Sequence, residues 1–267
     1  MKRAVLSLSL LLFAASVHAE DTEARGDRLW ARRAEGFAAT QKADPEIAAG
    51  AVQAYEEALR TRPRDLALRF KLVEALYFAG HFADRSSEVA RKRFERAVEV
   101  SEEACSIAGE AGPQAVEAHF WAAISWGLWG MSHSTLAAAM HDVAGKIRDH
   151  ASRVAALAPG YRDAAGWRIL GRLHVQVPYI PMITGWVSRD DGIAFLRKAQ
   201  AASDRDPRNP LFLAEALLAE RPQKREQALA LLREVAARTP RPELLVEDTE
   251  MVTEARRELA KAQQEAG

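Results

Sequence analysis

The chain has 267 residues, and 48% of them are hydrophobic, which is enough for a sizeable core. Its 37 basic and 37 acidic residues balance to a formal net charge of zero, which gives no indication of nucleic-acid binding. Cys105 is the single cysteine, which excludes an intramolecular disulfide and a metal site built from several cysteines.

The N-terminus has the pattern of an export signal. Met1–Arg3 is a charged start, residues 4–16 form an apolar run, and Val17–Ala19 is a small-residue cleavage site. The apolar run is too short to cross a bilayer. We therefore expect a signal peptide over residues 1–19, cleaved after its last residue, and a single mature domain over residues 20–267. The residue directly after the cleavage site is Glu20 and not a cysteine, so the predicted location is periplasmic or secreted, without a lipid anchor.

The first part of the mature chain predicts helices in succession. One helix is expected over Asp21–Ala43. Asp44–Glu46 then supplies an N-cap, a first-turn proline and a first-turn acid for a helix that runs to about Arg60. A second pair of helices is expected over Leu66–Ala79 and Ser86–Ile107.

Three of the six tryptophans, Trp121, Trp126 and Trp129, lie in the next predicted helix, Val116–Gly130. This helix is apolar nearly all round. A helix of that kind is buried in a core or lines a cavity, and the sequence leaves both interpretations open.

The second half predicts further helices around one irregular run. The expected elements are a long helix Thr135–Ala158, a helix from about Arg162 that includes Trp167, a proline-containing apolar run Val177–Trp186, a helix capped by Ser188, a helical pair within Leu211–Ala237, and a polar terminal helix Glu250–Glu265. No strand pattern of useful length occurs.

Several of these helices repeat one pattern. Leu66–Gly80 and Val116–Gly130 align without a gap, and the spacing of Trp167, Leu170, Gly171 and His174 nearly reproduces the first-helix signature of tetratricopeptide (TPR) repeats. The partner-helix signature fits Ala51, Tyr55, Ala58 and Pro63. The sequence therefore predicts an all-α, TPR-like helical-hairpin solenoid of about five helix pairs plus a C-terminal capping helix.

Motifs for catalysis are scarce. The chain has no G-x-S-x-G, G-x-G-x-x-G, Walker or H-E-x-x-H motif. His141-Asp142 followed by Gly145-Lys146 resembles the His-Asp pair of helical HD-type metal phosphohydrolases, but the Gly-Lys pair is rotated by about 100° around a helix by one extra residue. The alternative is an exposed polar helix face. We expect no catalytic residue, no metal and no cofactor.

The order of features resembles TatT-type periplasmic TPR proteins, which are associated with TRAP transporters, a class of tripartite solute importers. The resemblance covers about Ala51–Leu218 through YEEALRTRPRDLALRFKLVEALYFAG, EAHFWAAISWGLWG, LAPGY, LGRL and LFLAEALL. It implies a non-catalytic adaptor that assists transport by binding an extracytoplasmic protein, the TRAP solute-binding component, and a hydrophobic ligand. A general cell-envelope TPR scaffold is the alternative. The oligomeric state, including a homo-oligomer, stays open.

The predicted ligand site combines the tryptophan helix with the irregular apolar run. Exposing that run to water would leave an unusually apolar patch, so we expect it to fold back toward the helix. The residues predicted to line the pocket are Phe120, Trp121, Ile124, Leu128 and Trp129 with Tyr179, Met182 and Trp186. The alternative is that the two segments pack on each other as filled core.

Overall fold

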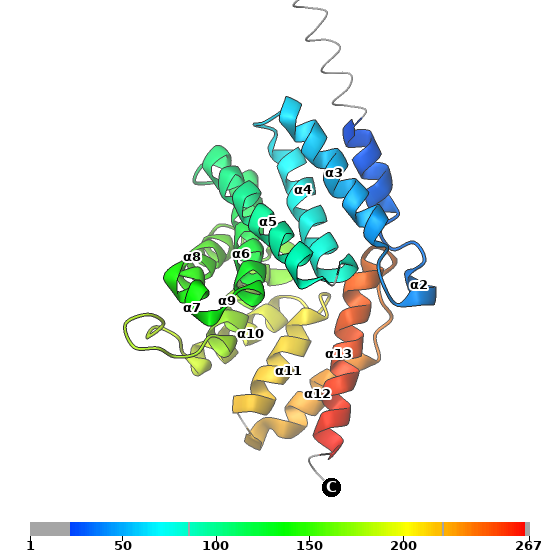
Figure 1. Cartoon of the computed structure of the whole chain (residues 1–267). Helices are drawn as coiled ribbons and strands as arrows, with labels where there is room; N and C mark the ends of the chain where they lie inside the picture. The colour runs from blue at the N-terminus through cyan, green and yellow to red at the C-terminus, as the bar shows by residue number, and fades with distance from the viewer. Residues whose placement is uncertain (1–21, 85, 221, 265–267) are drawn as a thin grey trace, which may run out of the picture. The chain divides into compact units, whose positions relative to one another are not determined.

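A computed structural model describes residues 22–84, 86–220 and 222–264, and within these ranges every regular element is helical (Figure 1). The predicted signal peptide over residues 1–19 lies outside the described residues. None of the described helices is both long and apolar enough to cross a bilayer. The chain forms two compact units that meet in sequence between Ser132 and His133. The expectation of a single domain over residues 20–267 stays a prediction.

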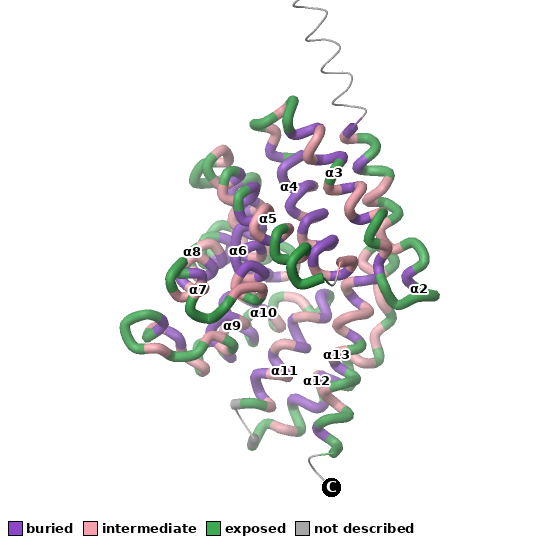
Figure 2. Tube along the Cα trace, in the orientation of Figure 1, coloured by how far each residue is buried: buried purple, intermediate pink, exposed green. Residues whose placement is uncertain are grey.

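The first unit is a run of helices in which sequence neighbours pack together. Its elements are a first helix over residues 22–31, α2 (Phe37–Thr40), α3 (Pro45–Thr61), α4 (Leu66–Phe78), the π-helical turn η1 (Ala79–Ala83), α5 (Ser87–Ala108) and α6 (Pro113–Ser132). Helix α4 contacts α3, α5 and α6, and it is buried along most of its length (Figure 2). Packing of each helix on the next is the arrangement of a helical solenoid.

The second unit continues the same pattern. Its elements are α7 (Thr135–Met140), α8 (Val143–Leu157), α9 (Tyr161–Gln176), α10 (Arg189–Ala202), α11 (Arg208–Glu220), η2 (Pro222–Lys224), α12 (Arg225–Ala236), η3 (Pro242–Leu244) and α13 (Leu245–Gln264). Each α-helix from α8 to α13 packs on the one before it, and α11 also contacts α9 and α13.

Local signals place most helix ends where the sequence predicts them. The Asp44 carboxylate accepts hydrogen bonds from the amides of Glu46 and Ile47, and the Ser188 hydroxyl accepts one from the amide of Asp191. These bonds satisfy amides that have no partner inside the helix. The predicted starts of α3 and α10 are therefore confirmed.

Two predicted helices are broken in the structure. The helix predicted over Asp21–Ala43 ends at residue 31, and a turn follows in which Gly36 has a φ of 74°. The helix predicted over Thr135–Ala158 breaks at Asp142, whose φ is 48°. Aspartate tolerates this left-handed conformation better than most residues, and its carboxylate lies where a side chain at Gly145 would clash.

Small residues meet large ones where helices cross, as the TPR signatures predict. A Cβ atom at Gly80 would lie 2.5 Å from a Phe94 ring carbon, and one at Gly171 would lie 2.6 Å from Cγ of Leu196. Ala51 and Ala58 are buried on α3. Only small side chains allow such close approach, so the repeat pattern is a packing requirement.

The start of α9 has an unusual backbone conformation. Arg162, Asp163 and Ala164 have φ values of 43°, 59° and 62°. Left-handed geometry costs a non-glycine residue about 1–2 kcal/mol. The segment therefore needs support from the residues around it.

A buried polar network supplies this support. The Arg168 guanidinium donates to the backbone carbonyl of Asp163 and to the Asn209 side chain, at 3.1 and 2.8 Å. The Asn209 amide donates to the same carbonyl at 3.0 Å and to the Ser203 carbonyl at 2.8 Å. The network joins α9 to the first turn of α11 and to the loop between α10 and α11.

Candidate binding surfaces

The tryptophan helix is the most buried predicted site element. Phe120, Trp121, Leu128 and Trp129 are buried on α6, and Ile124 is partly buried; Trp121 is only 3% exposed. The helix extends to Ser132, two residues beyond the predicted end.

The rings of α6 contact other rings of the first unit. Trp121 lies with its ring centroid 5.0 Å from that of Phe120 and 6.3 Å from that of Tyr77 on α4. Trp126 lies 5.8 Å from Trp129, and its indole nitrogen donates a 2.6 Å hydrogen bond to the Glu102 carboxylate on α5. These contacts are typical of a packed core.

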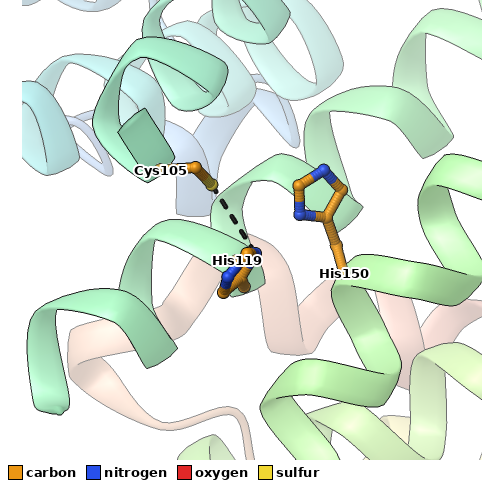
Figure 3. A group of neighbouring side chains, drawn as sticks. All are labelled: Cys105, His119 and His150. Atoms are coloured by element: carbon orange, nitrogen blue, oxygen red, sulfur yellow. Dashed lines mark hydrogen bonds between the residues drawn. The ribbon is translucent and has the colours of Figure 1, made fainter. Parts of the chain in front are cut away.

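Cys105 and His119 face each other from α5 and α6 (Figure 3). The Cys105 sulfur lies 3.7 Å from Nδ1 of His119. Burial raises the pKa of the Cys105 thiol to about 12, so the thiol is protonated at neutral pH and is a poor nucleophile. His150, also drawn in that figure, belongs to α8 of the second unit.

The irregular apolar run of the second unit is an exposed loop over residues 177–188, here called the apolar loop. Its twelve residues include no charged side chain. Tyr179 is 63% exposed, Met182 is fully exposed, and Ile183 is also exposed. The tryptophan helix and this loop belong to different units, and a common pocket lined by both stays a prediction.

The apolar loop is held by hydrogen bonds within itself. The buried Thr184 hydroxyl donates to the Pro178 carbonyl at 2.6 Å and accepts from the Ile180 amide at 2.8 Å. The amides of Ile183 and Thr184 both donate to the Ile180 carbonyl. These bonds hold Met182 in the left-handed region, at a φ of 65°. The loop is therefore an ordered turn that presents apolar side chains to solvent.

The base of the apolar loop is anchored to α9 through His174. Nδ1 of His174 accepts a 3.1 Å hydrogen bond from the Ser188 amide, and the Arg189 guanidinium donates to the His174 carbonyl at 2.8 Å. The Trp186 ring meets the imidazole edge-on at 5.3 Å, and Arg148 of α8 lies 4.6 Å from the Trp186 centroid. Burial lowers the pKa of His174, which favours the neutral imidazole that this acceptor role requires.

His141 and Asp142 lie in the turn between α7 and α8, not on the face of a continuous helix. Both are exposed. Among the described residues, this pair belongs to no group of three or more side chains placed to ligate one metal ion. The geometry at this turn therefore gives no support to the hydrolase alternative.

The comparisons with known proteins agree with the repeat architecture. The chain superposes on the crystal structure of TTC0263, a thermophilic TPR protein from Thermus thermophilus, with a TM-score of 0.54 over 92% of this chain and 99% of that one. The two sequences are 15% identical. The chain has the TPR fold. The predicted all-α TPR-like solenoid is therefore confirmed.

A second solved structure, of MamA protein, matches less closely. The TM-score is 0.47 at 16% identity, and the match covers 81% of this chain and 89% of that chain. No protein-family model matches the chain, and no curated protein matches its sequence.

Proposed function

We propose that this chain is a non-catalytic, exported TPR adaptor that binds another extracytoplasmic protein, with the solute-binding protein of a TRAP transporter as the first candidate. The observation that carries the proposal is the apolar loop. It is an ordered, charge-free turn on a TPR scaffold, and it exposes Tyr179, Met182 and Ile183.

Physical chemistry favours a protein partner for this loop. Aromatic residues and methionine are enriched at protein interfaces, where large side chains bury much apolar area. The hydrogen bonds of Thr184 already order the loop, so binding costs little further conformational entropy. A charge-free surface also avoids the cost of desolvating ionic groups at the centre of an interface.

A second apolar surface in the same unit extends the contact area available to a partner. Leu136 and Met140 of α7 are 71% and 78% exposed, and their spacing of four places them on one helix face. Repeat proteins bind partners over such extended surfaces.

The location and the partner class rest on the sequence. The signal-peptide pattern over residues 1–19 predicts export, and the order of motifs over Ala51–Leu218 resembles the TRAP-associated TPR proteins. An exported adaptor meets its partner outside the cytoplasm. Direct binding to the TRAP solute-binding protein of the same organism is therefore the sharpest test.

The experiment measures the affinity of the purified mature chain for that solute-binding protein by biolayer interferometry. The double variant Tyr179→Ser/Met182→Ser should weaken binding at least about tenfold, because truncation of interface anchors typically costs more than about 1 kcal/mol each. Leu157→Ser is the matched control, since Leu157 is a partly exposed apolar residue of α8 in the same unit.

The outcomes separate the alternatives. Wild-type affinity in the double variant would refute the role of the apolar loop. Absence of binding to the solute-binding protein would refute the TRAP assignment and favour a general cell-envelope scaffold. Native mass spectrometry of the same sample determines whether the chain forms a homo-oligomer.

A further inference from the structure

A small cavity lies within the second unit, where the loop before α11 meets the segment that connects α12 to α13. Its volume is about 150 Å³. The lining residues are Arg205, Pro207, Arg238, Thr239, Pro240, Arg241, Asp248 and Val252. Three arginines and one carboxylate therefore surround it, an excess of positive charge in a chain that is neutral as a whole.

The lining of the cavity is partly apolar and partly cationic. Pro207 and Val252 are buried, and Pro240 is half-buried. Arg205 is exposed. A ligand that fills the cavity therefore meets both apolar residues and arginines.

Two of the three arginines are held by protein groups. Arg241 binds the Asp248 carboxylate through its backbone amide at 3.0 Å and through Nε and Nη2 at 2.7 Å each. Arg238 donates to the Asp204 carbonyl at 2.6 Å and forms an ion pair with Glu234. These bonds fix the position of the connecting segment.

Arg205 differs from the other two. Within the described ranges its guanidinium has no hydrogen bond and no ion pair, although its backbone is fixed, with its amide donating to Ser203 and its carbonyl accepting from Arg238. A guanidinium on a fixed backbone beside a cavity can bind a carboxylate through two parallel hydrogen bonds.

Asp206, the residue that follows Arg205 in the chain, does not neutralise this charge. Asp206 is buried and is engaged by Arg208 and Arg168, with N···O distances of 2.7 and 3.3 Å. Burial alone would raise the pKa of Asp206, but the two arginines hold it well below its usual range. The Asp206 carboxylate therefore stays ionised against its own two arginines.

We propose that this cavity binds a carboxylate that carries a short branched apolar group. The Arg205 guanidinium receives the carboxylate, and Pro207, Pro240 and Val252 contact the apolar part. Cavities of about 150 Å³ hold one benzene molecule, which has as many non-hydrogen atoms as a four-carbon acid. Such a group occurs in a free short-chain carboxylic acid and at the C-terminal valine of a polypeptide.

Calorimetric titration of the full mature chain with isobutyrate and with isobutyramide tests the charge requirement. The buffer contains no carboxylate or phosphate that would compete. Isobutyrate should bind in about the millimolar range, as expected for a ligand of so few atoms, and the neutral amide should bind at least about tenfold more weakly. Equal affinity for the two compounds, or binding of neither, would overturn the proposal.

Variants test the position of the site. Arg205→Gln should weaken isobutyrate binding at least about fivefold, as expected when a charged hydrogen bond is lost. Arg197→Gln is the matched control, because Arg197 is an exposed arginine on α10 that does not line the cavity. An equal loss in both variants would mean that the acid binds the protein surface non-specifically, which contradicts the proposal.

Two further titrations distinguish the sources of the carboxylate. N-acetyl-alanyl-valine and its C-terminal amide present the same apolar group on a peptide. Binding of the peptide acid tighter than isobutyrate assigns the cavity to a polypeptide C-terminus, and exclusion of the peptide assigns it to a free acid. The proposal does not depend on the apolar loop, so each can fail alone.

Discussion

Helix α6 and the apolar loop are similar in composition and opposite in exposure. Each has few or no charged side chains and several large apolar ones, yet Trp121 of α6 is 3% exposed while Tyr179 of the loop is 63% exposed. In α6 the backbone hydrogen bonds are made within the helix, so every face can pack against neighbours. In the loop, Pro178 and Pro181 prevent a helix, and the chain turns outward on the hydrogen bonds of Thr184. Apolar composition alone therefore did not decide burial.

The largest expected effect is in α6. Trp121→Ala should lower the free energy of unfolding by about 3–5 kcal/mol, because it removes a large buried side chain and leaves a cavity. Urea unfolding followed by circular dichroism measures the change. The matched loop variant Met182→Ser should stay within about 0.5 kcal/mol of wild type, as is usual for exposed positions.

The result for Trp121→Ala also tests the predicted ligand pocket. A clearly smaller loss of stability, together with weaker binding of an apolar dye, would favour a ligand-lined cavity over a filled core. A loss of stability of about 3–5 kcal/mol, as expected for a filled core, with no dye binding by the wild type would contradict the pocket.

A smaller effect is expected where α9 and α10, the helices that flank the loop, cross. Gly171→Ala would place a Cβ atom 2.9 Å from the Gly192 carbonyl and 2.6 Å from the Leu196 side chain. The helices must separate, at a cost of about 1–3 kcal/mol, as in other overpacked cores. Thermal unfolding measures this cost, and unchanged stability would contradict the close crossing.

Within the loop, Thr184→Val tests whether internal hydrogen bonds hold the exposed turn. The change keeps the shape of the side chain but leaves the Ile180 amide and the Pro178 carbonyl without the hydroxyl, at a cost of about 1–2 kcal/mol. Hydrogen exchange of the loop amides should accelerate. Unchanged exchange would show that the loop stays ordered without the hydrogen bonds of the Thr184 hydroxyl.

The smallest expected effect is a pH dependence at the base of the loop. Burial lowers the folded-state pKa of His174, so its stabilising contribution is complete above the unfolded-state pKa of about 6.5 and is lost as the pH falls through the folded-state pKa. The charge of Asp191 opposes this lowering of the pKa, and the charge of Arg148 adds to it. The hydrogen bond from the Ser188 amide requires an unprotonated Nδ1, so protonation of His174 breaks it.

Unfolding measured between pH 7.5 and 5 should therefore show a decrease in stability with falling pH that is smaller in His174→Gln. This variant cannot gain the proton, although it also loses ring contacts with Trp186 and Phe195. The comparison accordingly uses the slope of stability against pH and not its absolute value. An identical slope in the variant would show that His174 is not the source of the pH dependence.

The sequence predicted features that depend on nearby residues. Asp44 and Ser188 cap their helices as expected, because a cap acts within three residues. The crossing of Gly171 with Leu196 follows from a repeat signature that encodes small-residue contacts. The break at Asp142 was missed, because a left-handed aspartate is compatible with a helical pattern on both sides.

The sequence by itself determined that this protein is an array of paired helices, because caps, small residues and apolar spacing act over one or two turns. Only the tertiary structure decided which apolar residues are buried and which charges gather. The arginine-lined cavity combines residues 205–207, residues 238–241 and α13. In the sequence, the Arg-Asp-Pro and Arg-Thr-Pro stretches that supply the arginines look like ordinary breaks between helices. These residues lie together because α10 to α13 pack against one another. No short-range sequence pattern predicts a contact between segments so far apart in the chain.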